Sequence, residues 1–88
     1  MVTVIDFYAK WCGPCKMMDP IVNAVEKEME GKVAFDKVDV DTHTEKASQF
    51  GVLGIPTYVI MKDGKEVDRM VGYMPKEEFV KKIQAQLG

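Results

Sequence analysis

The 88-residue chain lacks the features that mark membrane, nucleic-acid-binding and metal-binding proteins. It has no run of about 18 apolar residues, the length a helix needs to cross a bilayer. Its formal net charge is only −2, with acidic and basic residues mixed, so no basic patch indicates a nucleic acid. His43 is the only histidine, which leaves few ligands for a metal. We therefore expect no membrane span, no nucleic-acid partner and no metal site.

Cysteine is equally scarce, because Cys12 and Cys15 are the only two. Two cysteines are too few for the disulfide framework of many small secreted domains. The first residues lack a basic segment followed by a cleavable apolar one, so we expect a cytoplasmic protein. In that compartment a lone cysteine pair is more often catalytic, redox-sensing or metal-binding than structural. The length fits a single domain over residues 1–88.

Hydrophobic patterning predicts seven elements in the order β-α-β-α-β-β-α, which is an α/β domain with a mixed sheet. Strands are expected at 2–9, 33–40, 57–61 and 66–71, and helices at 14–30, 44–50 and 75–87. The first strand is apolar apart from Thr3 and Asp6, so we expect burial on both faces. Asp63-Gly64 predicts a hairpin between the last two strands. The first helix has an apolar face, which we expect in the core: Met17, Met18, Ile21, Val22, Val25 and Met29.

The chemistry of the chain is concentrated in the pentapeptide Trp11-Cys12-Gly13-Pro14-Cys15. Two cysteines three positions apart can close into a small disulfide ring when the first lies at the start of a helix. There the unpaired N–H groups and the positive end of the helix dipole favour the thiolate of Cys12, which is the nucleophilic form. We expect Cys15, one turn further on, to be more shielded and to act as the resolving thiol.

Three other uses of the cysteine pair are possible. A purely stabilising disulfide is disfavoured, because so short a loop contributes only about 2 kcal/mol in the chain-entropy model. A zinc site needs four ligands, and the chain offers Cys12, Cys15 and His43. Covalent haem attachment needs a histidine directly after the second cysteine, where Lys16 stands. Thiol–disulfide exchange is therefore the favoured interpretation.

Further motifs connect the pentapeptide to a known family. The matching residues are 6–7, 11–17, 39–41, 51–52, 54–57, 63–64 and 71–72, together with Pro20. On these residues the chain resembles the thioredoxins. The resemblance implies a thioredoxin-like fold with three helices and a four-stranded mixed sheet in the order 2-1-3-4. It also implies a monomeric protein-disulfide reductase that binds no cofactor. A thioredoxin reductase, either a flavoprotein or a ferredoxin-linked enzyme, is implied to reduce its disulfide again after each cycle.

The resemblance assigns catalytic roles to two charged residues. It implies that Asp6 lies beneath the cysteines and takes the proton of Cys15, a role that burial supports by raising the pKa of a carboxylate. A strand-end residue that reaches solvent is the alternative for Asp6. Lys37 is implied to pair with Asp6, although an exposed lysine on a strand is equally compatible with the sequence.

The resemblance also implies a surface for substrates. It places a cis peptide bond before Pro56 opposite the disulfide, which leaves the backbone of Ile55 free to pair with an extended substrate peptide. The alternative is that Pro56 simply begins a strand. The implied contact residues are Trp11, Gly13, Pro14, Gly54, Ile55, Pro56 and Gly72.

The chain departs from ordinary thioredoxins at its start, because they carry a strand and a helix before the segment equivalent to 2–9. We therefore expect strand 33–40 to lie at a sheet edge, where its charged residues discourage pairing with another chain. An oxidase, isomerase or glutaredoxin is the first alternative function. It is disfavoured because Gly13-Pro14 offers no cation to stabilise the Cys12 thiolate further, which makes the couple more reducing. A non-catalytic binding module is the second.

Overall fold

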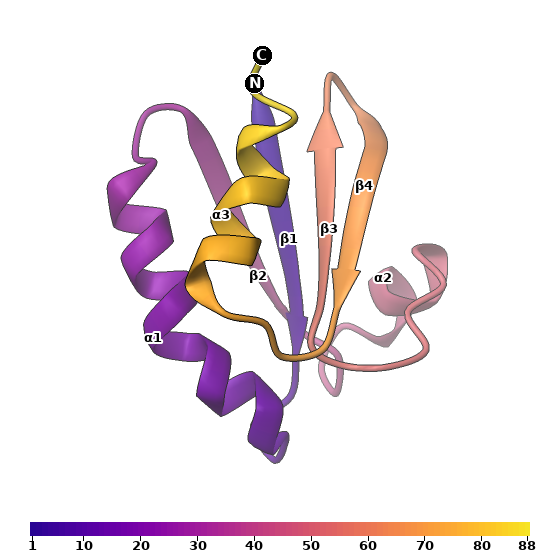
Figure 1. Ribbon diagram of the computed structural model, residues 1–88. Coiled ribbons are helices and arrows are strands. Elements are labelled where there is room, and N and C mark those ends of the chain that lie inside the picture. The colour runs from indigo at the N-terminus through magenta and orange to yellow at the C-terminus, as the bar shows by residue number, and fades with distance from the viewer.

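The computed structural model describes residues 1–88 and contains the seven elements in the predicted order (Figure 1). The strands are β1 (Val2–Tyr8), β2 (Val33–Asp39), β3 (Thr57–Lys62) and β4 (Lys65–Val71). The helices are α1 (Gly13–Glu28), α2 (Thr44–Gln49) and α3 (Lys76–Gln84). None of the helices combines the length and the apolar character that a bilayer span requires.

The four strands form one mixed sheet in the order β2-β1-β3-β4, which confirms the predicted topology. Strand β1 runs parallel to β2 and antiparallel to β3, and β3 runs antiparallel to β4. Strand β2 therefore lies at an edge of the sheet, as expected. Because Phe7 of β1 pairs with Thr57 of β3, the end of β1 and the start of β3 meet at one end of the sheet. Helix α1 begins at that same end (Figure 1).

Helices cover both faces of the sheet, and this arrangement decides where Asp6 points. Helices α1 and α3 lie on one face and α2 on the other (Figure 1). Val2 and Val4 pack into the cluster with α1 and α3, whereas Ile5 and Phe7 pack into the cluster beside α2. Since side chains alternate along a strand, Asp6 shares the α1 face with Val2 and Val4. The apolar strand is buried on both faces because both are covered.

The apolar face of α1 differs from the prediction at one residue. Met18, Val22, Val25 and Met29 are buried, as predicted, and lie at spacings of four, three and four along the helix. Met17 is 58% exposed, so its placement in the core was wrong. The helix advances about 100° per residue, so a position directly beside Met18 lies outside a stripe of that spacing.

The residues of the turn explain the hairpin between β3 and β4. Asp63 and Gly64 have positive φ values of 54° and 80°, as a two-residue type I′ turn requires.

Helix α3 ends at Gln84 rather than at the predicted position 87. There the N–H groups of Gln86 and Leu87 donate three residues back, to the carbonyls of Ile83 and Gln84, so the α-helical pattern is lost.

Candidate active site

The two cysteines lie at the start of α1 and form a disulfide. Cys12 is the N-cap residue, with extended backbone (φ −83°, ψ 113°), and Pro14 occupies the first turn, where its missing N–H costs nothing. The backbone N–H of Cys15 donates to Sγ of Cys12 over 3.2 Å. The Cα atoms of the pair are 5.3 Å apart, within the ordinary range for a disulfide.

The positive end of α1 acts on Cys12 without local competition. The first turn of the helix contains no acidic residue. An anionic sulfur at Cys12 would therefore meet both the helix dipole and the N–H group of Cys15. Both interactions favour a thiolate at Cys12 when the disulfide is open.

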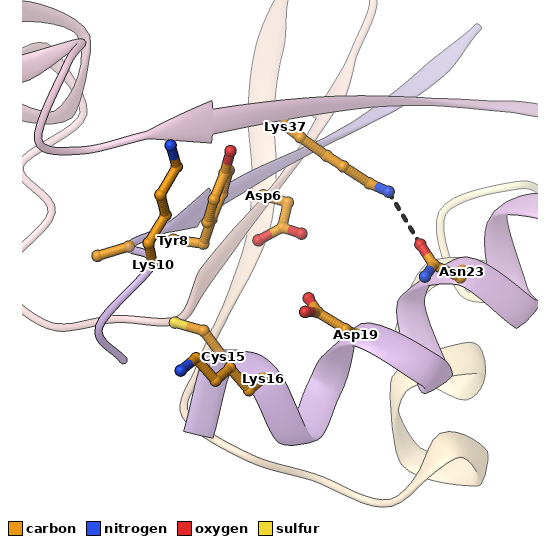
Figure 2. Close-up of a pocket in the computed structure, with 9 residues that line it drawn as sticks. Asp6, Tyr8, Lys10, Cys15, Lys16, Asp19, Asn23 and Lys37 are labelled. Atoms are coloured by element: carbon orange, nitrogen blue, oxygen red, sulfur yellow. Dashed lines mark hydrogen bonds between the residues drawn. The ribbon is translucent and has the colours of Figure 1, made fainter. Parts of the chain in front are cut away.

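Accessibility does not distinguish the two cysteines, contrary to expectation. Cys12 and Cys15 are each 4% exposed, so Cys15 is not the more shielded one. They differ instead in the direction they face. Sγ of Cys12 lies 3.8 Å from the carbonyl oxygen of Ile55. Cys15 lines a cavity on the other side, between α1 and the sheet (Figure 2).

That cavity joins Cys15 to Asp6. It has a volume of about 410 Å³, and its charged lining residues are Asp6, Lys10, Lys16, Asp19 and Lys37. Asp6 is 5% exposed, and its Oδ1 atom is buried without a hydrogen-bond partner. In Figure 2 the Asp6 carboxyl group points from β1 toward α1, on which Cys15 and Asp19 lie. The prediction that Asp6 is buried near the cysteines is confirmed, and the solvated alternative is wrong.

Burial makes Asp6 a weaker acid than an ordinary aspartate. Desolvation, the largest influence, raises the pKa of Asp6 from 3.8 to about 6. The charge of Lys37 acts in the opposite direction, while the charges of Asp19 and Glu26 add to the increase. A carboxyl group with this pKa can both accept and release a proton near neutral pH.

Lys37 does not form the predicted ion pair with Asp6. The two residues are direct neighbours across β1 and β2, so the register places them side by side. The Nζ atom of Lys37, however, donates to Oδ1 of Asn23 over 2.9 Å and lies 3.3 Å from Oε1 of Glu26. Both partners belong to α1, which draws the ammonium group away from Asp6. Lys37 therefore lines the cavity without neutralising the carboxylate.

Asp6→Asn is expected to stabilise the fold at neutral pH and not in acid. The pKa of Asp6 is raised from 3.8 to about 6, so the folded protein holds this proton more tightly than the unfolded chain does. Ionised Asp6 therefore costs stability, with no cost below about pH 4 and the full cost, at most roughly 3 kcal/mol, above about pH 6. Urea unfolding between acid and neutral pH measures the difference. Glu30→Gln, an exposed change in the turn after α1, serves as control. Parallel wild-type and Asp6→Asn curves would mean that Asp6 is solvated.

The residues expected to contact substrates meet beside Cys12. The Ile55–Pro56 peptide bond is cis, as the resemblance implied. The N–H of Ile55 has no hydrogen-bond partner, and its carbonyl faces only the sulfur of Cys12. The N–H of Gly72 donates to the carbonyl of Pro56 over 2.8 Å, which fixes the end of β4 against this loop. Contact with substrates remains a prediction for these residues and for Gly13, Pro14 and Gly54.

Trp11 is anchored by a residue to which the sequence analysis gave no role. Trp11 is 70% exposed, and its indole Nε1 donates to Oδ2 of Asp41 over 2.8 Å. Oδ1 of Asp39 accepts the N–H of Asp41 over 2.9 Å and fixes the turn that carries it. Residues 39–41 were among the family matches, which was the one available signal. A pairing across 30 positions has no local pattern in the sequence.

Asp41→Ala is expected to weaken substrate binding more than the chemical step. It removes an exposed hydrogen bond, so the stability should fall by no more than about 1 kcal/mol. The indole then loses its fixed orientation, and we expect KM for a protein disulfide to rise by about two- to fivefold with little change in kcat. Steady-state reduction of insulin measures both constants, with Glu77→Ala on α3 as control. A fall in kcat alone would contradict this role.

The zinc alternative lacks support in the structure. No three histidine, cysteine or acidic side chains are grouped as metal ligands would be. His43 precedes α2, and its Nδ1 atom lies 2.9 Å from Oγ1 of Thr42.

A disulfide that closes at a helix N-terminus, beside a buried carboxyl group, defines a thiol–disulfide oxidoreductase. Comparisons with known proteins agree. The thioredoxin family model matches residues 1–85. The thioredoxin of Chlamydia caviae is 46% identical over 82 residues, which cover 93% of this chain and 79% of that protein. The thioredoxin of Bacillus subtilis is 42% identical over 86 residues, or 98% of this chain and 83% of that protein.

Solved structures give the same answer. Fasciola hepatica thioredoxin superposes with a TM-score of 0.89 at 44% identity, over 96% of this chain and 79% of that one. A mutant thioredoxin from Halobacterium salinarum gives 0.91 at 37% identity, over 99% and 75%. The chain belongs to the thioredoxin family.

Proposed function

We propose that the protein reduces disulfides in other proteins by two successive exchanges. The thiolate of Cys12 attacks one sulfur of a substrate disulfide, forms a mixed disulfide and expels the other substrate sulfur as a thiolate. Cys15 then attacks Sγ of Cys12, closes the Cys12–Cys15 disulfide and releases the second substrate thiolate. The N-cap position of Cys12, with the N–H of Cys15 donating to its sulfur over 3.2 Å, carries this assignment.

Asp6 is proposed to accept the proton of Cys15 in the second exchange. Cys15 must lose its proton to become a nucleophile, and the shared cavity gives that proton a short route to Asp6. The unpartnered Oδ1 of Asp6 has a free lone pair for it. Asp6→Asn should therefore slow reduction near neutral pH while leaving the first attack by Cys12 intact.

The loop before β3 is proposed to hold the substrate peptide. The backbone N–H and carbonyl of Ile55 lie outside the sheet ladder and can pair with an extended chain, as strands do at a sheet edge. The carbonyl lies beside Sγ of Cys12, so a peptide bound there would bring its disulfide to the attacking sulfur. Trp11, the residue before Cys12, supplies an exposed apolar surface for the bound chain.

The proposed electron donor is a thioredoxin reductase, either a flavoprotein or a ferredoxin-linked enzyme. The protein itself is proposed to act as a cytoplasmic monomer without a bound cofactor, since the two sulfurs carry both electrons. Gly13-Pro14 adds no cation beside Cys12, so we propose that the couple is more reducing than the glutathione pool.

Insulin reduction tests the proposal when it is coupled to each candidate reductase. We expect turnover that depends on the protein with at least one reductase, and a potential below that of glutathione by equilibration with a glutathione buffer. If the protein supports insulin reduction with none of the reductases and not with dithiothreitol, the reductase assignment is overturned. A potential above that of glutathione would favour an oxidase or isomerase instead.

A further inference from the structure

Asp6 is unpartnered although a cation of suitable charge lies on the next strand. Lys37 is its direct neighbour in the register of β1 and β2, and alternation places both side chains on the α1 face. An ion pair is the ordinary result of such a juxtaposition. It does not form because Asn23 and Glu26 bind the ammonium group, at 2.9 and 3.3 Å.

One polar face of α1 carries these two residues and a third. Asp19, Asn23 and Glu26 follow Cys15 at spacings of four, four and three, so all lie on one side of the helix. Asp19 lines the same cavity as Asp6 and Cys15. Figure 2 shows its carboxyl group projecting from α1 toward Asp6, with the Lys37–Asn23 hydrogen bond further along the helix.

We propose that Asp19, Asn23 and Glu26 form a positioning device that keeps Asp6 unpaired and able to accept the proton of Cys15. Asn23 and Glu26 restrain Lys37, and Asp19 places a like charge at the cavity. The inference rests on the proposed function in its role for Asp6. If Lys37 were released, it could pair with Asp6, hold it in the charged form and weaken it as a base.

The electrostatics of the cavity agree with this geometry. Burial is the main cause of the raised pKa of Asp6, and Asp19 and Glu26 add to the increase that Lys37 opposes. Other titratable groups line the cavity or face Asp6 from each neighbouring element: Tyr8 and Lys10 at the end of β1, Cys15 and Lys16 on α1, and Tyr58 on β3. Tyr58, whose pKa burial and the Asp6 charge raise, stays neutral.

The test is an NMR titration of the Asp6 carboxyl carbon in the disulfide form, where neither cysteine titrates. Asp19→Asn should lower the pKa of Asp6 by about half a unit to one unit, because a like charge is lost. Asn23→Ala combined with Glu26→Gln should lower it at least as far, because Lys37 becomes free. Lys37→Met should raise it, and adding Lys37→Met to the double variant should remove most of the decrease.

Glu30→Gln is the matched control, since it removes one negative charge from a position outside this cavity, and it should leave the pKa unchanged. Asp19 and Asn23 are exposed, so their variants should fold, and the amide spectrum verifies this. An unchanged pKa in both Asp19→Asn and the double variant would overturn the inference, as would an equal shift in Glu30→Gln.

A kinetic experiment separates this inference from the proposed function. Stopped-flow release of the second thiol from an aromatic disulfide reagent follows the attack by Cys15 as a function of pH. If the pKa of Asp6 moves in the variants and the pH profile of release moves with it, both proposals are supported. If the pKa moves and the profile does not, the positioning of Asp6 stands and its role as base is overturned.

Discussion

Cys12→Ser is expected to abolish disulfide reduction, with a loss of at least about a thousandfold in kcat/KM. A serine hydroxyl is not ionised near neutral pH, and the N-terminus of α1 cannot lower its pKa enough to compensate. The N-cap position tolerates the change well, because serine is itself a preferred N-cap residue. The variant should therefore fold normally and fail only in chemistry.

Insulin reduction with dithiothreitol or an active reductase as donor measures this loss. Ala85→Ser, which adds a hydroxyl at the C-cap of α3, should retain full activity. A thermal unfolding curve close to that of the wild-type protein shows that the fold is intact. Activity retained in Cys12→Ser would remove Cys12 as the nucleophile and, with it, the proposed reaction order.

Cys15→Ser is expected to trap substrates instead of releasing them. The variant keeps the Cys12 thiolate and its helix N-terminus, so the first exchange still proceeds. The second exchange lacks its nucleophile, and the mixed disulfide at Cys12 should accumulate to near-stoichiometric amounts, whereas the wild-type protein holds almost none. Turnover should fall as far as in Cys12→Ser, although for a different reason.

Non-reducing electrophoresis followed by mass spectrometry of the linked peptides detects the adducts. Each adduct should join a substrate cysteine to Cys12 and disappear with dithiothreitol. The Cys12→Ser/Cys15→Ser double variant should form none. If Cys12→Ser captured substrates through Cys15 and Cys15→Ser captured none, the order of attack would be the reverse. This comparison matters because the two cysteine residues are equally buried in the structure.

Local sequence patterns were sufficient for the order of the secondary-structure elements and for the position of the cysteine pair, whereas the strand order was implied by the resemblance. The apolar run of β1 predicted a strand covered on both faces, and Asp63-Gly64 predicted the turn that orders β3 and β4. The position of Cys12 before Pro14 predicted an N-cap. Each of these inferences depends on residues within one turn or one strand of each other. The burial of Asp6 beneath the cysteines was instead implied by the resemblance, because the strand pattern left a solvated position open.

The parts that were missed depend on contacts between distant segments. The resemblance implied that Lys37 pairs with Asp6, whereas no local sequence pattern indicated that Asn23 and Glu26 on the helix would compete for it. The anchoring of Trp11 by Asp41 joins two loops that only the folded sheet brings together. Met17 was misplaced because the start of α1 offered two adjacent methionines, and the direction of the helix decides between them.

Lys37 also lies at the edge of the sheet, and this position constrains how the protein could evolve. It lies on the edge strand β2 beside Asp36, whose carboxylate pairs with Lys46 of α2 over 2.8 Å on the opposite face. Alternating charges on a sheet edge oppose pairing with other chains. A change at Lys37 would therefore alter the proton chemistry of the cavity and the tendency of the molecule to self-associate together. Adaptation to another pH is less constrained at Asp19, which lies away from the sheet edge, so we expect variation among close relatives to concentrate there.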